Sequence, residues 1–358
     1  MYLIRTRNQT CQFRLVVLIL CAVLFVVIVV HQYLGQSTQV PAIDSNDKNE
    51  EHERVSIQKE EGPQLTMKVA KSTEYSAKEA FLEKQSGVQL QRHKYIQESC
   101  AKHPELNMGG ISSTTQGQLL VIDKHKLLYC FIQKAGCTNW KRLLMVMDGN
   151  QNRTEDITTG MAHAYFSENK RTLRSFNTRE QQHRLETYTK FIFTRHPFER
   201  VLSAYGNKFA NMDVYRGSPP YQKIGKYIMK KFRKNATMRE LNTGETITWS
   251  EWASYLAKAN KALFDLHWKE FYQLCSPCKI NYDYIGTLDT VYDDSEYIMS
   301  KLDVQTKVSY PPKSVSVPSN GSENFDHYMS QLSKEQIQNL WEVYQLDFEL
   351  FGYPKPSF

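Results

Sequence analysis

The sequence predicts an α/β fold in which a central parallel sheet is flanked by helices. Two segments support this prediction, because each has a short apolar run typical of a buried strand, then a loop, then apolar residues at helical spacing. The first pairs a strand at 127–132 with a helix at 138–147. The second pairs a strand at 191–194 with a helix from Pro197 to about Phe209. Such units are typical of parallel sheets covered by helices.

The signals at helix ends agree with these elements. Thr138 is a plausible N-cap, and Pro197 stands at the first helical position, where proline is favoured. Further helices are predicted at 249–256 and 334–344, whereas 309–322 is rich in Pro, Ser and Gly and is predicted to be a loop.

The N-terminus contains a candidate membrane anchor. Residues 15–34 are apolar and free of charge over most of their length, and they follow Arg5, Arg7 and Arg14. This pattern predicts a cytoplasmic tail at 1–14 and a transmembrane signal anchor at 15–34, with the rest of the chain in the lumen. A cleaved signal peptide is the alternative, although no small-x-small site follows Val30.

Residues 35–94 are predicted to form a luminal stem, and residues 95–358 a globular domain. The stem is rich in Glu, Lys, Gln and Ser, so it should not bury enough apolar surface to fold as a core. Within it, 75–96 is compatible with a helix.

In the lumen, some asparagines could be glycosylated and some cysteines could form disulfides. Three sequons are possible glycosylation sites, at Asn152, Asn235 and Asn320. Five cysteines would meet an oxidising environment: Cys100, Cys130, Cys137, Cys275 and Cys278. Because five is odd, at least one thiol must stay free or pair between chains. The closely spaced pair Cys275 and Cys278 favours a disulfide or structural role over a zinc site.

The charge distribution favours an anionic ligand other than nucleic acid. A net charge of +7 is too mild for a nucleic-acid binder. Two basic clusters are nevertheless visible. Residues 217–239 contain no acid, and the second cluster consists of Arg171, Arg174, Arg179 and Arg184. They are either solvated surface or a site for a polyanionic glycan.

The first segment with a chemical signature joins the strand at 127–132 to its helix. It comprises Gln133, Lys134, Ala135, Gly136, Cys137, Thr138 and Asn139. A helix N-terminus, a glycine and a lysine together favour a bound phosphate. The lysine precedes the glycine, so this is not the loop of nucleoside triphosphatases. An ordinary strand–helix turn is the alternative.

The second such segment comprises Arg195, His196, Pro197, Phe198, Glu199, Arg200, Val201, Leu202 and Ser203. Arg195 follows a strand and Ser203 lies two turns into the next helix, so both are expected at the carboxyl edge of the sheet, where ligands bind. Glu199 and Arg200 could equally form a solvated helix face.

Together the two segments resemble the donor-binding loops of Golgi carbohydrate sulfotransferases, in particular the chondroitin, dermatan and HNK-1 group. The typical family patterns are P-K-V-A-C-T-N-W-K-R and R-D-P-F-E-R-L-V-S-A-Y-R-N-K-F. The chain reads Q-K-A-G-C-T-N-W-K-R from Gln133 and R-H-P-F-E-R-V-L-S-A-Y-G-N-K-F from Arg195. The departures at Gln133, Gly136, His196 and Gly206 leave Lys134, Thr138, Arg195 and Ser203 in place.

The resemblance implies a nucleotide-kinase-like sulfotransferase fold for 95–358, anchored in the Golgi membrane as a single-pass type II protein. It implies 3'-phosphoadenosine-5'-phosphosulfate (PAPS) as sulfuryl donor and no metal. The two segments listed above would bind PAPS, with Lys134 acting at the sulfuryl group. The acceptor would be an anionic glycan, with the 4-O position of N-acetylgalactosamine in chondroitin or dermatan as the leading expectation.

A base for the acceptor hydroxyl is most often histidine. His163 lies between the two loops in sequence and resembles the base of related heparan 2-O-sulfotransferases, while His267 is the alternative. The sequence leaves other functions open: sulfation of another glycan terminus, a glycan-binding pseudoenzyme, and a nucleotide kinase, which the missing metal-binding loop disfavours. It gives no indication of the oligomeric state.

Overall fold

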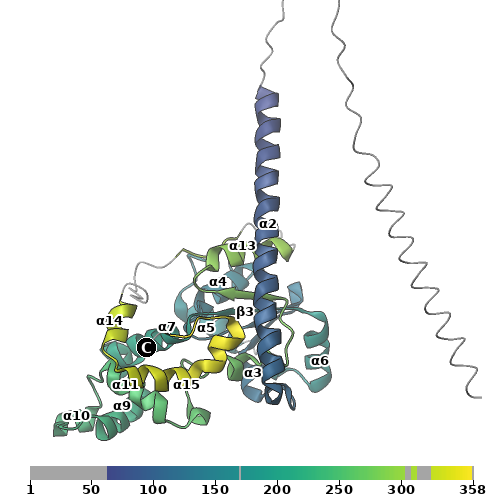
Figure 1. Cartoon of the computed structure of the whole chain (residues 1–358). Coiled ribbons are helices and arrows are strands. Elements are labelled where there is room, and N and C mark those ends of the chain that lie inside the picture. The colour runs from purple at the N-terminus through teal and green to yellow at the C-terminus, as the bar shows by residue number, and fades with distance from the viewer. Residues whose placement is uncertain (1–62, 169–170, 303–307, 313–323, 357–358) are drawn as a thin grey trace, which may run out of the picture. The chain divides into compact units, whose positions relative to one another are not determined.

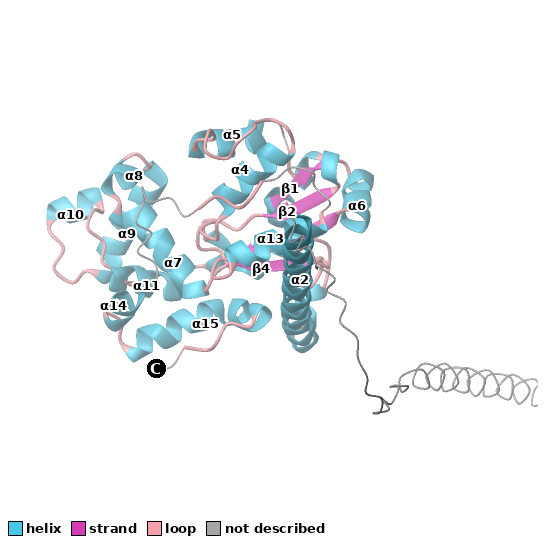
Figure 2. Ribbon diagram, turned by 90° about the horizontal axis from the view of Figure 1, so that it is seen from above, coloured by secondary structure: helices cyan, strands magenta, loops and turns pink. Residues whose placement is uncertain are grey.

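The structure is a computed structural model that describes residues 63–168, 171–302, 308–312 and 324–356. At its centre is a four-stranded sheet in the order β1-β2-β3-β4 (Figure 2). The strands are β1 (Leu119–Ile122), β2 (Leu127–Cys130), β3 (Thr189–Thr194) and β4 (Tyr284–Thr287). The predicted α/β architecture, with a central sheet flanked by helices, is confirmed.

The sheet is not parallel throughout, so that part of the prediction is wrong. β2, β3 and β4 are parallel, but β1 pairs with β2 antiparallel. The reason is the short connection between β1 and β2, a 3₁₀ turn at Asp123–His125 followed by Lys126 in a left-handed conformation. Strands joined by so short a turn can pair only antiparallel.

Both predicted strand–loop–helix units are present. β2 leads into α4 (Cys137–Met147), and β3 leads into α7 (Pro197–Tyr205). The predicted N-cap at Thr138 is wrong, because Gly136 occupies that position and Thr138 lies inside the helix. The second helix is also shorter than predicted, since a π-helical turn, η4 (Gly206–Ala210), follows Tyr205.

The remaining helices surround the sheet and extend to one side of it (Figure 1). The α-helices are α2 (Pro63–Lys102), α3 (Ser113–Gln118), α5 (Thr159–Glu168), α6 (Thr178–Thr187), α8 (Met212–Arg216), α9 (Pro219–Phe232), α10 (Met238–Thr243), α11 (Trp249–Lys258), α12 (Phe271–Cys275), α13 (Val291–Lys301), α14 (Phe325–Ser330) and α15 (Lys334–Phe351). Further 3₁₀ turns are η1 (Pro104–Asn107), η3 (Leu173–Ser175) and η5 (Lys261–Leu263). The helices predicted at 249–256 and 334–344 are confirmed as α11 and α15, the latter longer by two turns.

Alternating residues of the strands fill two cores, one on each face of the sheet. Tyr129 and Phe191 pack with Trp140 of α4 on one face. Leu128 and Ile192 belong to the core of the other face, with residues of α12 and α15. A third core joins α7, α9, α11 and α15 and contains Trp249, Trp252 and Trp268. The sheet and the helical layer therefore have separate but adjoining cores.

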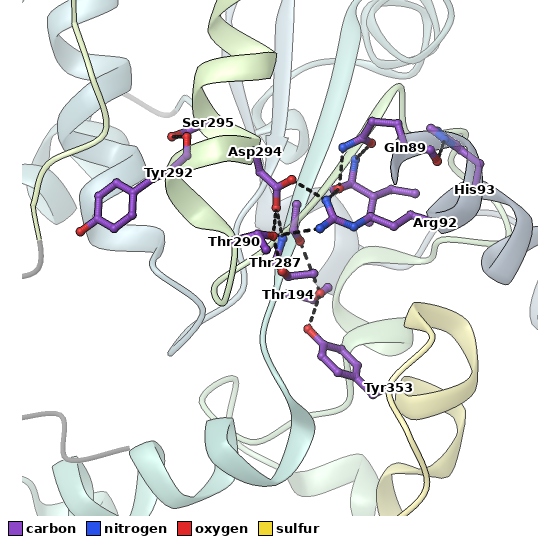
Figure 3. A network of polar contacts seen from close by, with 12 residues as sticks. Gln89, Arg92, His93, Thr194, Thr287, Thr290, Tyr292, Asp294, Ser295 and Tyr353 are labelled. Carbon is purple, nitrogen blue, oxygen red and sulfur yellow. Dashed lines mark hydrogen bonds and ion pairs between the residues drawn. The ribbon is translucent and has the colours of Figure 1, made fainter. Parts of the chain in front are cut away.

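Helix α2 docks on the edge strand β4 through polar groups (Figure 3). The Gln89 amide donates to the Ile285 carbonyl (3.0 Å) and accepts from its N–H (2.9 Å), so it hydrogen-bonds the edge as a neighbouring strand would. Arg92 donates to the same carbonyl and forms an ion pair of 2.6 Å with the buried Asp294. Covering the unpaired edge of a sheet in this way protects it from pairing with other chains.

The helix predicted at 75–96 is confirmed and is longer than predicted. The expectation that 35–94 does not pack is wrong for its last part, since Gln85 and Gln89 are buried. The segment packs through polar contacts, which a count of apolar residues cannot reveal. Helix α2 runs across the boundary between 94 and 95 that the sequence suggested, and that boundary stays a prediction.

Two disulfides fix this arrangement. Cys100 at the end of α2 is bonded to Cys278, and Cys130 at the end of β2 is bonded to Cys275 at the end of α12. Cys275 and Cys278 are therefore not bonded to each other, and neither thiol remains for zinc. Among the described residues Cys137 is the free cysteine, in keeping with the odd number, which left at least one thiol either free or paired between chains.

Within the described residues, no helix is long and apolar enough to cross a membrane. The predicted tail at 1–14, the anchor at 15–34, most of the stem and the sequon at Asn320 lie outside these residues. The other two sequon residues, Asn152 and Asn235, are exposed.

Candidate functional site

The loop between β2 and α4 has the backbone of an anion-binding turn. Lys134 and Gly136 both adopt positive φ angles, of 69° and 78°. Only glycine suits the second position, because a Cβ there would lie 2.6 Å from the Tyr310 hydroxyl. Among the described residues, the N–H groups of Cys137 and Thr138 have no backbone partner. These N–H groups belong to the first two residues of α4, where the helix dipole also favours a bound anion.

The side chains of the other residues of this loop stabilise its conformation and do not face a bound ligand. Ala135 and Cys137 are buried. The Gln133 side chain donates to the Gln118 side chain, and Oδ1 of the Asn139 side chain accepts from Arg142 at 2.6 Å. Lys134 and Thr138 remain partly exposed and are the side chains of this loop best placed to meet a ligand.

Lys134 lies in an electropositive environment. Burial, together with the neighbouring charges of Lys208 and Arg195, lowers its pKa to about 8. Cationic side chains that lie close together suit an anionic ligand, because a bound anion relieves their mutual repulsion.

Arg195 connects the two predicted loops. Its guanidinium pairs with Glu199 (3.2 Å) and contacts the Lys134 carbonyl at 3.5 Å. Glu199 and Ser203 are four residues apart in α7 and so share one face of the helix. Arg195 and Lys134 are thereby brought together near the carboxyl ends of β2 and β3, and Ser203 lies one turn along α7 from Glu199.

Arg200 has a different role from the one its position suggested. It is 1% exposed, so the alternative of a solvated helix face is wrong for this residue. Its guanidinium donates to three carbonyls, those of Gln133 (2.9 Å), Leu266 (2.9 Å) and Lys269 (2.8 Å). Arg200 therefore ties the first loop to the segment that carries His267.

The remaining members of the second segment anchor α7. Pro197, Phe198, Val201 and Leu202 are buried in the helical core. His196 is surrounded by the rings of Phe198, Phe325, Phe348 and Tyr353. Burial, and then the charge of Arg195, lower the pKa of His196 to about 4, against an opposing effect of Asp289. A neutral packing residue is what this environment requires.

Both candidate bases lie at the same site. His163, on α5, is within 3.2 Å of the Lys141 ammonium through Nδ1 and within 3.4 Å of the Thr138 hydroxyl through Nε2. Burial, then the charges of Lys141 and His267, lower its pKa to about 4. Burial also lowers the pKa of His267, against the opposing effect of Asp265, whose carboxylate lies 2.5 Å from Nδ1.

Sequence reasoning missed three residues of the site: Lys208, Asp265 and Tyr221. Lys208 lies inside the quoted motif, so its position was available as a signal. The D-x-H spacing of Asp265 and His267 was a second signal. Tyr221, whose hydroxyl lies 3.5 Å from His267 Nδ1, had none, because only the fold brings α9 to this loop.

The predicted basic clusters separate into paired and unpaired residues. Arg171 pairs with Asp148 and Arg184 with Asp123. Arg233 is held by two glutamates, Glu240 and Glu251. Four lysines of α9 are exposed and form no ion pair with any described residue: Lys223, Lys226, Lys230 and Lys231. We call these four the lysine face of α9.

No group of three or more His, Cys, Asp or Glu side chains that could hold a metal ion occurs among the described residues. The site thus offers cationic side chains, free backbone N–H groups and two histidines. Such a set can bind a phosphorylated or sulfated anion and accept a proton from a hydroxyl.

Comparison with known proteins agrees with this chemistry. The chain is 35% identical over 273 residues to carbohydrate sulfotransferase 8 of Homo sapiens, covering 75% of this chain and 63% of that relative. It is 36% identical over 243 residues to carbohydrate sulfotransferase 11 of Mus musculus (67% and 68%). For carbohydrate sulfotransferase 10 of Homo sapiens the identity is 34% over 283 residues (76% and 77%).

The chain thus spans somewhat less than two thirds of the first of these relatives. No solved structure matches it. Residues 117–354 match the model of a family described as the Sulfotransferase family. The resemblance to carbohydrate sulfotransferases is confirmed, and the chain belongs to the Sulfotransferase family.

Proposed function

We propose that the protein transfers a sulfuryl group from PAPS to a carbohydrate hydroxyl and releases adenosine 3',5'-bisphosphate. The observation that carries the proposal is the meeting of Lys134, Arg195 and the free N–H groups of α4 beside two histidines. An anion-binding loop next to a proton acceptor is what transfer from an anionic donor to a hydroxyl needs.

The two loops would hold the two ends of the donor. Lys134 and the N–H groups of Cys137 and Thr138 suit the 5'-phosphosulfate, which supplies an activated sulfuryl group. Arg195 and Ser203 suit the 3'-phosphate. As in phosphoryl transfer, positioning and charge neutralisation should supply most of the catalysis.

The proton of the acceptor hydroxyl needs a base, and the site contains both histidines that the sequence suggested. His163 was the first choice and His267 the alternative. Their hydrogen bonds differ, and the next subsection develops the choice between them.

For the acceptor we propose N-acetylgalactosamine in chondroitin or dermatan, sulfated at the 4-O position by an enzyme held in the Golgi membrane with its catalytic domain in the lumen. The resemblance of both loops to that group supports this, and so does the lysine face of α9, which suits a polyanionic chain. Sulfation of another glycan terminus, as in the HNK-1 group, is the alternative.

The test uses the detergent-solubilised full chain with radiolabelled PAPS and a panel of desulfated glycosaminoglycans and HNK-1-type oligosaccharides. We expect label in chondroitin or dermatan, and 4-O-sulfated N-acetylgalactosamine after digestion. Label in the HNK-1-type acceptors alone would overturn the proposed identity of the acceptor. A protein that binds PAPS but labels no glycan would be the pseudoenzyme.

A further inference from the structure

Asp265 and His267 form a carboxylate–imidazole pair at the candidate site, with a distance of 2.5 Å between Asp265 Oδ1 and His267 Nδ1. A carboxylate can only accept hydrogen bonds, so the imidazole hydrogen lies on Nδ1. The lone pair of Nε2 is then available to receive a proton. In hydrolases, a carboxylate that sets the histidine tautomer in this way prepares it as a base.

His163 has the opposite arrangement. Its Nδ1 faces the Lys141 ammonium, which can only donate, so the lone pair of Nδ1 is already engaged. The hydrogen of the neutral ring then lies on Nε2, directed at the Thr138 hydroxyl. Neither nitrogen of His163 is free to take a proton in this arrangement.

The segment that carries His267 is held in place from several sides. Arg200 donates hydrogen bonds to the carbonyls of Leu266 and Lys269, the residues before His267 and after Trp268. Trp268 is fully buried, and the Asp265 carboxylate also accepts the backbone N–H of His267 at 2.9 Å. The same Arg200 holds the Gln133 carbonyl, so the donor loop and the histidine share one anchor.

From this geometry we infer that His267, oriented by Asp265, accepts the proton of the sugar hydroxyl. This rests on the proposed function. The hydroxyl oxygen forms its bond to sulfur while the bond between sulfur and the bridging phosphate oxygen breaks, and the electron pair of that bond stays on the phosphate. The hydroxyl proton passes to Nε2 of His267. Asp265 touches neither substrate and is a positioning residue.

The groups that face His267 come from five elements of the chain. Asp265 lies on its own segment, Tyr221 on α9, Lys208 on η4, Lys134 on the donor loop and His163 on α5. Of these, the carboxylate of Asp265 raises the pKa of His267, whereas the lysines lower it. Removing Asp265 should therefore shift the acidic limb of the kcat profile to lower pH, by about one unit or more.

The experiment compares three variants of the full chain in detergent: His267→Ala, Asp265→Asn and Asp265→Ala. We expect His267→Ala and Asp265→Asn to lower kcat by about 10²–10⁴-fold, with the dissociation constant for PAPS within about threefold of wild type. The asparagine amide can donate to Nδ1 and so moves the hydrogen to Nε2. Asp265→Ala should retain more activity than Asp265→Asn, and the acidic limb of its kcat profile should be shifted to lower pH.

A measurement that does not need turnover accompanies these assays. In ¹⁵N-histidine NMR spectra, wild-type His267 should carry its hydrogen on Nδ1, and Asp265→Asn should move it to Nε2. Normal turnover by His267→Ala, or loss of turnover in Asp265→Ala without a shift of the acidic limb, would overturn the inference and leave the proposed function standing. If wild type labels no acceptor, it is the proposed function that fails.

Discussion

The pKa of Lys134 makes donor binding depend on pH in a range that can be measured. Burial and the neighbouring charges of Lys208 and Arg195 lower this pKa to about 8. An ammonium attracts the donor anion and a neutral amine does not. Affinity for PAPS should therefore fall as the pH rises through this value, whereas an ordinary lysine would stay charged until about pH 10.

The size of the effect follows from the fraction of free protein that carries the charge. With a pKa of about 8, that fraction is roughly 90% at pH 7 and roughly 10% at pH 9. The bound anion keeps the ammonium protonated, so the free-state pKa governs the loss. The dissociation constant should rise about tenfold over these two pH units, equivalent to about 1.4 kcal/mol.

Calorimetric titration of the full chain with PAPS, without acceptor, measures this directly. Lys134→Arg is the matched control, because a guanidinium stays protonated and its affinity should be nearly independent of pH in this range. Equal affinities of wild type at pH 7 and pH 9 would refute the assignment of Lys134. So would the same tenfold loss in the arginine variant, which would point to another group, such as Lys208.

Four further predictions follow from other parts of the molecule. Arg195→Ala should lower transfer by about 10²–10³-fold with an unchanged circular dichroism spectrum, and activity within threefold of wild type would contradict its role. Replacing the lysine face of α9 with glutamine should raise KM about tenfold for a long chondroitin chain but not for a tetrasaccharide, and a matched set on α2 should change neither: Lys78, Lys84, Lys94 and Lys102. Endoglycosidase should increase gel mobility, with one step lost in each of Asn152→Gln and Asn235→Gln, and no shift in wild type would argue against luminal topology. Burial raises the pKa of Asp347 to about 7, so its stabilising contribution is lost as pH rises from about 4 through 7. The melting temperature of Asp347→Asn should therefore fall less over this range than that of wild type, and parallel curves would count against this reasoning.

The parts of the fold that local patterns determine were predictable. The apolar strands followed by helical spacing gave β2 with α4 and β3 with α7, and the loop chemistry pointed to Lys134 and Arg195. Strands β1 and β4 have only four residues each, too few for a periodic signal, and were missed; β2 is equally short but was recognised together with the loop and helix that follow it.

What the sequence could not predict depends on contacts between distant segments. The burial of Arg200 is possible only because three carbonyls from two other loops surround it. Likewise, the sequence assigns Gln89 and Arg92 to the stem, and only the fold shows that both side chains donate to the edge strand β4. The disulfide pairing also requires the fold, since the number of cysteines sets only the possibilities.

The hydrogen-bond partners of the two histidines illustrate the same limit. Both were visible as candidates, but whether a ring faces an ammonium or a carboxylate is decided by packing. Lys141 lies one helix away from His163, whereas Asp265 is only two residues from His267. Our inference that His267 is the base therefore depends on contacts that the sequence does not show.

The central claim is that the two loops bind PAPS for sulfuryl transfer to a glycan. The most direct test is transfer of ³⁵S from labelled PAPS to desulfated chondroitin or dermatan by the full chain, beside a Lys134→Ala, Arg195→Ala double variant. The account predicts glycan-bound label that increases with time for wild type and none above background for the double variant. Equal labelling by both proteins, or label from wild type in no glycan, would contradict it.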